Sequence, residues 1–151
     1  MQNHNFKNLK AWQLSRSLVK AIYEVTATFP ADERYGICSQ MRRAAVSIPS
    51  NIAEGSGRTD RDFHRFLSMS LSSAYELETQ LILSADLNLL PAGVSDNLSL
   101  QVQEVQRVIY GFQRKLSTSF LGSFIVPLPI LKSMLRRSLI LPLASFILLL
   151  Y

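Results

Sequence analysis

The chain has 151 residues, 48% of them hydrophobic, and a formal net charge of +5. This length can bury one sizeable core, so we expect one domain. The single Cys38 excludes an intramolecular disulfide framework, and MQNHNFKNLK lacks the apolar run of a secretory signal, so we expect a cytoplasmic protein. Residues 1–116 carry 13 Lys and Arg against 11 Asp and Glu, a balance that by itself does not indicate nucleic-acid binding.

The first two predicted helices carry apolar residues at helical spacing. The first spans Leu9 to Phe29 and ends at Pro30, and the second follows the connector ADERYG. The apolar line of the second helix is Ile37, Met41, Ala45, Ile48 and Ile52. Pro49 lies inside this helix and removes one backbone donor, so we expect a bend there. We expect Gly55 and Gly57 to end the helix in the left-handed conformation.

The third and fourth helices follow after short breaks. The third runs from about Arg61 to Leu89, with Thr59 or Asp60 as its cap, and Pro91 and Gly93 break it. Its inward positions are Phe63, Leu67, Leu71, Ala74, Leu77 and Leu81. The fourth begins near Ser95 or Asp96 and carries a seam of Leu98, Val102, Val105, Ile109, Phe112 and Leu116. No run of strand period occurs in residues 1–116, so we predict an all-α antiparallel four-helix bundle with its second helix bent at Pro49.

The segment 117–151 has a different composition. It holds three of the six prolines, many Leu, Ile and Phe residues, and three basic but no acidic residues. Its final apolar run LILPLASFILLLY is shorter than the roughly 20 residues that a membrane-crossing helix needs. Three interpretations stay open: a membrane-associating hairpin, an extra packed segment, or a non-native extension of the bundle. A membrane is a partner only under the first.

The residues that could carry chemistry do not form a convincing catalytic or metal site. EGSGRTDRD lacks the lysine of a phosphate-binding loop and follows a helix instead of a strand. Asp60 and His64 share a helix face, but two ligands make a weak metal site. Glu76 and Glu78 are two residues apart and diverge on a helix, so they cannot act as one acid–base pair. We therefore expect no enzyme activity, no cofactor and no metal.

A polar line on the second helix is the first candidate binding feature. Its members recur at steps of three and four: Gln40, Arg43, Ser47, Asn51 and Glu54. A helix with separate apolar and polar seams often has two neighbours, so we predict that this line forms a subunit interface. The alternative is an ordinary solvated face.

A basic cluster is the second candidate feature. Arg58, Arg61 and Arg65 lie at steps of three and four around the turn between the second and third helices. Guanidinium groups bind phosphates well, and we add Arg42 and Arg43 as further candidate contacts for nucleic acid. The alternative is a solvated helix start, because Asp60 and Asp62 dilute the charge.

Several phrases resemble the four-helix-bundle proteins encoded within 23S ribosomal RNA intervening sequences. They are LKAWQLSRSLV, TFPADERYGICSQMRRAAVSIPSNIAEGSGR, FHRFLSMSLSSAYELETQL and VIYGFQRKL, and together they cover most of residues 6–116. The resemblance implies an all-helical subunit in a ring-like homo-oligomer, with a homopentamer as the expected assembly and no catalytic residues. The chain is also similar to the accessory proteins of diversity-generating retroelements, basic pentameric bundles associated with nucleic acid.

The sequence thus favours a non-enzymatic homo-oligomeric bundle that binds structured RNA through basic residues. Ribosomal or intervening-sequence RNA is the expected partner, beside other copies of the chain. The alternative is a scaffold module with a protein partner and no nucleic acid.

Overall fold

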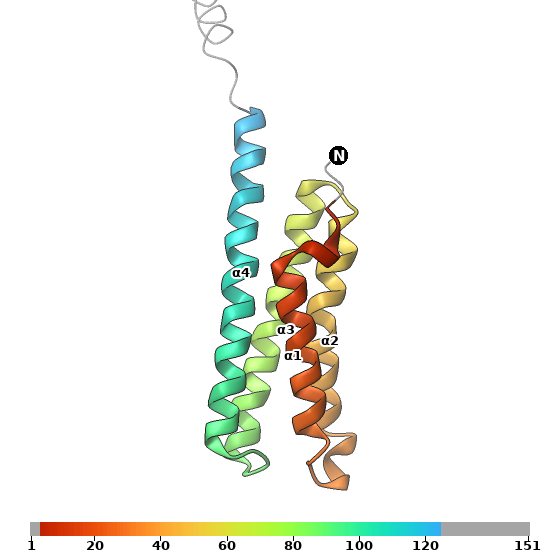
Figure 1. Cartoon of the computed structure of the whole chain (residues 1–151), viewed down its shortest axis with the longest axis vertical. Coiled ribbons are helices and arrows are strands. Elements are labelled where there is room, and N and C mark those ends of the chain that lie inside the picture. The colour runs from red at the N-terminus through yellow and green to blue at the C-terminus, as the bar shows by residue number, and fades with distance from the viewer. Residues whose placement is uncertain (1–3, 125–151) are drawn as a thin grey trace, which may run out of the picture. The chain divides into compact units, whose positions relative to one another are not determined.

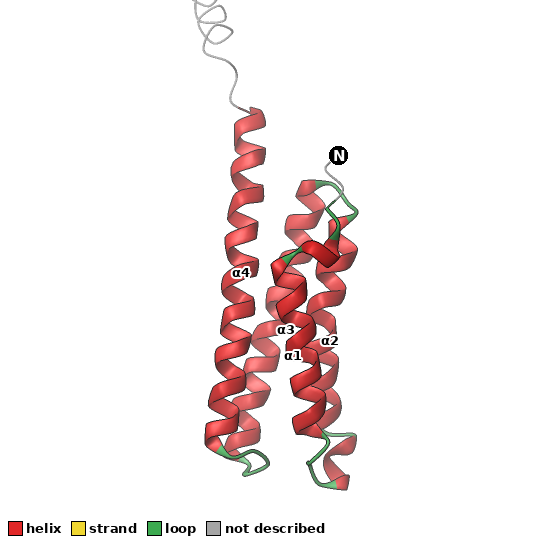
Figure 2. Ribbon diagram, viewed as in Figure 1, coloured by secondary structure: helices red, strands yellow, loops and turns green. Residues whose placement is uncertain are grey.

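The computed structural model describes residues 4–124, with side chains described as far as Ser117. Its helices are α1 (Lys10–Thr26), α2 (Ile37–Ser56), α3 (Asp60–Asp86) and α4 (Ala92–Phe124) (Figure 1). Two short 3-10 helices, η1 (Phe6–Asn8) and η2 (Ala31–Arg34), precede α1 and α2. No strand occurs between residues 4 and 124 (Figure 2), so the predicted all-α class is confirmed.

Contacts divide the chain into a unit of Met1–Thr118 and a unit of Ser119–Tyr151. The first unit contains the bundle, and the description that follows concerns it alone. The three interpretations of segment 117–151 concern residues that, beyond Phe124, lie outside the described part of the chain.

The core of the bundle is apolar and receives side chains from all four helices. Each predicted inward position of the third helix is buried, as are Met41, Ala45, Ile48 and Ile52 of α2. Hydrogen bonds between helices supplement this core: the Ser70 hydroxyl of α3 donates to the carbonyl of Ile48 at 3.0 Å, and the Ser95 hydroxyl of α4 donates to that of Leu81 at 3.0 Å. A buried hydroxyl is costly unless it is paired, so these bonds also favour one register between the helices.

The α2 helix continues through Pro49 to Ser56. Its glycines differ from the sequence expectation, because no glycine within the described residues has a positive φ angle. Gly55 is buried inside α2, and a Cβ atom there would lie 2.6 Å from Phe66 Cβ and 2.7 Å from Phe63 Cδ2. Gly55 therefore permits close approach of α2 and α3, and the prediction of a left-handed helix end was wrong.

Local hydrogen bonds at the helix ends explain why α3 and α4 begin or end at other residues than the sequence predicted. Thr59 caps α3 by accepting a hydrogen bond from the amide of Asp62. Asn88 has a φ of 56°, and the Leu89 amide donates to the Ser84 carbonyl at 2.9 Å, so a left-handed residue closes α3 before Leu89. The Pro91 carbonyl accepts from the amides of Val94 and Ser95, so α4 starts before the predicted Ser95 and contains Gly93. It also extends beyond Leu116.

Candidate nucleic-acid interface

The middle of the predicted polar line lies between α2 and α3 of the same chain. The Ser73 hydroxyl of α3 donates to Ser47 Oγ at 2.8 Å, and Asn51 Nδ2 donates to the same oxygen at 3.0 Å. Ser47 and Asn51 are half-buried by this contact. Their polarity thus has an explanation within one subunit, and their role in an oligomer interface stays a prediction.

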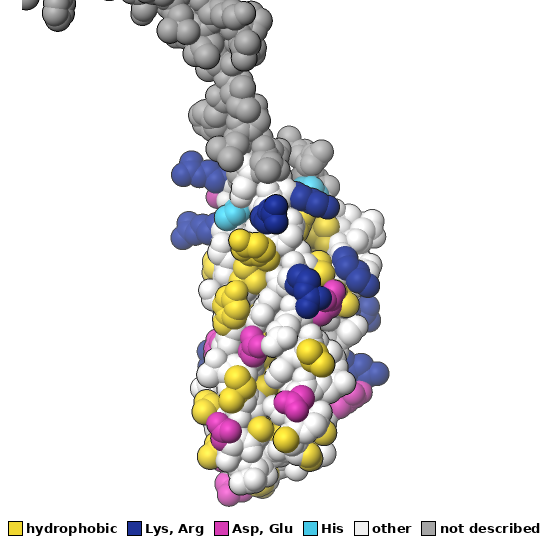
Figure 3. Space-filling view, turned by 90° about the vertical axis from the view of Figure 1, so that its left-hand side faces the viewer, with side chains coloured by type: hydrophobic (Ala, Val, Ile, Leu, Met, Phe, Trp, Pro, Cys, Tyr) yellow, Lys and Arg dark blue, Asp and Glu magenta, His cyan; other side chains and the backbone are white. Residues whose placement is uncertain are grey.

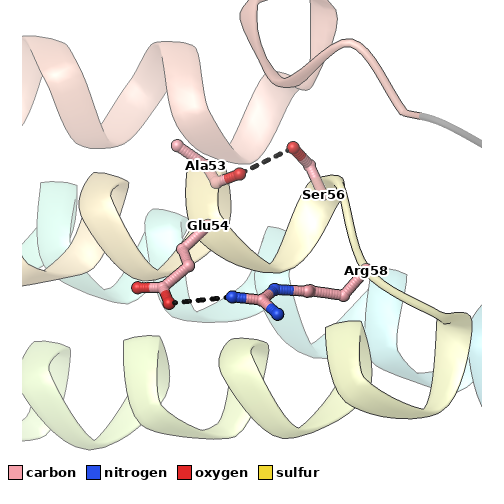
Figure 4. Close-up of polar contacts among 4 residues, drawn as sticks. All are labelled: Ala53, Glu54, Ser56 and Arg58. Atoms are coloured by element: carbon pink, nitrogen blue, oxygen red, sulfur yellow. Dashed lines mark hydrogen bonds and ion pairs between the residues drawn. The ribbon is translucent and has the colours of Figure 1, made fainter.

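The two ends of the polar line are exposed. Glu54 forms an ion pair at 3.6 Å with Arg58, which lies four residues later and beyond the end of α2, while the nearby Ser56 hydroxyl donates to the Ala53 carbonyl at 2.7 Å (Figure 4). The pair with Arg58 is more than half exposed on both sides, so it contributes little to stability. At the other end, Gln40 and Arg43 line an open hollow of about 470 Å³ that also includes Glu76.

The predicted phosphate contacts fall into two separate groups. Arg42 donates from Nε to Thr26 Oγ1 at 2.8 Å, and its guanidinium carbon lies 4.8 Å from the centre of the Tyr23 ring. These contacts hold Arg42 against α1. Arg43 lies about 20 Å along α2 from its end at Ser56, given the rise of a helix. The structure therefore does not bring Arg42 and Arg43 together with the arginines of the α2–α3 turn.

The other three arginines surround that turn. Arg58 follows the end of α2, and Arg61 and Arg65 lie on the first two turns of α3. All three are exposed, and the side chains of Arg61 and Arg65 form no hydrogen bond or ion pair with any residue that the structure describes. Asp62 is occupied at the cap, where its Oδ2 accepts from the Thr59 hydroxyl at 2.7 Å.

The last described turns of α4 add two cations that the sequence analysis did not identify. Gln113, only 7% exposed, donates from Nε2 to the His64 carbonyl at 3.1 Å and to Ser68 Oγ at 2.8 Å. These bonds fasten α4 to the beginning of α3, and the next two residues, Arg114 and Lys115, are exposed. The topology of the bundle could have predicted this placement, because two antiparallel helices joined by a short turn bring the end of the second helix beside the start of the first.

Charge is consequently segregated along the bundle. We define the basic half as residues 4–16, 50–71 and 109–117, which the Gln113 bonds and the bond from the His4 amide to the Ser56 carbonyl bring together. It contains eight Lys and Arg against three Asp and Glu, a net charge of +5. The remaining half, residues 17–49 and 72–108, contains five Lys and Arg against eight Asp and Glu, a net charge of −3. On the face shown in Figure 3, basic side chains gather toward one end and acidic ones toward the other.

Other kinds of site find little support in residues 4–117. No group of three or more His, Cys, Asp or Glu side chains within them is placed to hold a metal ion. Cys38 is buried and its thiol lies 3.5 Å from the Thr26 carbonyl. No helix in the described part of the chain is both long and apolar enough to cross a membrane.

Comparisons with known proteins agree with this fold. Residues 7–111 match the family described as 23S rRNA-intervening sequence protein. A crystal structure of a protein of unknown function from the S23 ribosomal protein family of Bacteroides thetaiotaomicron superposes with a TM-score of 0.64 at 19% identity, over 69% of this chain and 95% of that one. A search of curated proteins finds no match. Because the family match spans well over half of the residues, the chain belongs to the 23S rRNA-intervening sequence protein family.

Proposed function

We propose that this protein is a non-enzymatic bundle that binds structured RNA through its basic half. The observation that carries the proposal is the separation of a net charge of +5 in that half from −3 in the other. The family description, which refers to a 23S rRNA intervening sequence, makes that RNA or the surrounding ribosomal RNA the first candidate partner. Such a partner is consistent with the cytoplasmic location that the sequence predicts.

The charges of the basic half can act together because they come from three segments of chain that meet at one end of the bundle. Arg61, Arg65 and Arg114 are exposed, and none of them forms an ion pair with a described residue, so phosphate binding breaks no internal contact. Each phosphate that a cation neutralises releases bound counterions, so the affinity must fall as salt concentration rises. The hollow at Arg42 and Arg43 is a weaker candidate because Glu76 also lines it and Arg42 is already bound to Thr26.

The test measures affinity of the full chain for a structured RNA over a range of salt concentrations. The triple variant Arg61→Glu, Arg65→Glu and Arg114→Glu should lose at least about a hundredfold in affinity and have a shallower salt dependence. The matched control is Lys20→Glu, Arg34→Glu and Arg107→Glu, which changes the net charge equally through exposed residues of the other half.

If the control retains affinity while the triple variant loses it, the basic half is the binding surface. Equal loss in both variants would mean that net charge alone attracts the RNA. The absence of salt-sensitive binding by the unaltered chain would remove the proposal.

Self-association is a second candidate function, favoured by an apolar hollow on the outside of α1 and α2. It has a volume of about 360 Å³ and is lined by Phe6, Trp12, Arg16, Val19, Val46, Pro49, Ser50 and Ala53. Val46 is 41% exposed there, so burial in an assembly would remove apolar surface from water. The family resemblance points to a homopentamer.

Light scattering on the full chain tests the assembly. A mass of several subunits that falls on Val46→Glu would support an interface at the hollow, whereas a fall on Asn51→Leu or Arg43→Glu would support one at the polar line. A monomer at all concentrations would exclude both. An oligomer that never binds RNA would favour a scaffold with a protein partner.

A further inference from the structure

We propose that the RNA bound by this protein includes unpaired bases, which stack on Tyr75 of α3 and Tyr110 of α4. This inference rests on the proposed function and specifies its substrate as RNA with single-stranded loops or ends. Tyr75 is 56% exposed and Tyr110 is 60% exposed. Isolated exposed apolar residues are common, so the inference depends on where these two rings lie.

The hydrogen bonds between α3 and α4 place both tyrosines in the same section of the helix pair. Gln113 bonds to Ser68 on one side of that section, and Gln106 Nε2 donates to Glu78 Oε2 at 2.7 Å on the other. Tyr75 lies between Ser68 and Glu78 along α3, and Tyr110 lies between Gln106 and Gln113 along α4. The two tyrosines therefore lie at the same level of the helix pair, and we call the surface of α3 and α4 that carries them the α3–α4 face.

Neither ring is occupied within the described part of the molecule. The Tyr75 and Tyr110 side chains form no hydrogen bond, ring contact or cation–π contact with a described residue. Tyr23 offers a contrast, because the guanidinium of Arg42 already covers its ring. The two tyrosines of the α3–α4 face are thus available to a ligand.

One cation lies next to the ring of Tyr110. Arg114 is four residues after Tyr110, a spacing that makes side chains neighbours on a helix surface, and it belongs to the basic half with Arg65. At the other edge, Glu78 accepts hydrogen bonds from Gln103 and Gln106 and contributes negative charge. A strand held at the tyrosines would therefore direct its phosphates toward Arg65 and Arg114, away from Glu78.

Aromatic rings beside cations are typical of proteins that bind single-stranded nucleic acid. Every base can stack on a side-chain ring, so such binding tolerates many sequences. Bases in an A-form duplex are stacked on each other and are not available to a tyrosine, whereas loop bases can turn outward. A stem–loop would satisfy both features, with stem phosphates at the arginines and loop bases at the tyrosines.

The experiment compares two probes on the full chain: a stem–loop RNA with a uridine loop and a blunt RNA duplex with the same number of phosphates. Tyr75→Ala and Tyr110→Ala should each lower affinity for the stem–loop by about tenfold and leave affinity for the duplex unchanged. Tyr75→Phe and Tyr110→Phe keep the ring and should retain affinity. Tyr35→Ala is the matched control, because Tyr35 is 87% exposed but lies between η2 and α2, outside the α3–α4 face.

The outcomes separate this inference from the proposed function. If both probes bind in a salt-sensitive way and the tyrosine substitutions do not change the affinity for either probe, the stacking inference is overturned and the proposed function stands. Binding of neither probe would overturn both. If the Ala variants instead lower the assembled mass measured by light scattering, with stem–loop affinity intact, the α3–α4 face is a contact between subunits and the inference fails.

Discussion

The two halves of the bundle share one kind of interior but differ in their surfaces. Leu67 in the basic half and Leu81 in the other are both fully buried on α3, and in each half a buried polar side chain bonds α4 to α3. Their surface charges nevertheless have opposite signs. The comparison teaches that charge on a helical bundle can vary along its length without affecting the core, because exposed side chains barely enter the packed interior.

The largest expected effect tests the shared interior. Leu67→Ala and Leu81→Ala each remove a fully buried side chain from the same helix and should each lower the free energy of unfolding by about 3 kcal/mol. Urea denaturation of the full chain measures both. A cost below about 1 kcal/mol for only one of them would show that the halves differ inside as well.

The close approach of α2 and α3 in the basic half gives the next effect. Gly55→Ala places a Cβ 2.6 Å from that of Phe66, so the helices must separate, and we expect a loss of about 1–3 kcal/mol. Gly111→Ala is the matched control, because a Cβ there meets nothing within 4 Å and alanine favours a helix by up to about 1 kcal/mol. Thermal unfolding should move the two variants in opposite directions. A neutral Gly55→Ala would contradict the close approach.

A smaller effect concerns the attachment of α4 to the basic half. Gln113→Ala leaves the His64 carbonyl and the Ser68 hydroxyl without this donor and should cost about 1–2 kcal/mol. It should also weaken RNA binding severalfold, because Arg114 is then held less firmly. Gln106→Ala removes an amide that bonds to Glu78 and should cost less than about 1 kcal/mol with no change in RNA affinity. Equal effects of the two variants on RNA affinity would argue against a positioning role for Gln113.

The smallest effect sharpens the difference in charge. Glu54→Gln removes one of three acidic groups from the basic half and the ion-pair partner of Arg58. Stability should change by less than about 0.5 kcal/mol, since exposed ion pairs contribute little. RNA affinity at low salt should rise by about two- to threefold, as judged by fluorescence anisotropy. Weaker binding would indicate that Glu54 orients Arg58 for its contact.

Much of the fold follows from the sequence. The apolar spacing identified the four helices and the inward residues of α3, because a helix that packs in water must place its apolar side chains on one face. The helix ends were less predictable. Asn88 ends α3 in the left-handed conformation, which glycine adopts more often than asparagine. Gly55 permits a close contact between α2 and α3 and does not form a turn. Both depend on the neighbouring helix, which local spacing does not reveal.

The candidate site was predicted only in part. Arg58, Arg61 and Arg65 were found because they are close in sequence, but Arg42 was grouped with them although it binds Thr26 and covers Tyr23. Gln113 went unnoticed because a glutamine beside an apolar seam usually faces solvent. The sequence also did not predict which residues Ser47 and Asn51 contact. A polar line on a helix has the same pattern whether the neighbouring helix belongs to the same chain or to another subunit.

By itself, the sequence determined the helical class, the four-helix pattern, most of the core and the local run of arginines, all of which depend on spacings within one segment. Only the tertiary structure decided which segments meet: the segment of Arg114 and Lys115 lies beside the beginning of α3, and the part of α3 that carries Tyr75 lies beside the part of α4 that carries Tyr110. The physical reason is that the position of a surface charge or aromatic ring depends on the position of its helix in the bundle. The relative placement of those helices is set by buried contacts between residues far apart in the chain.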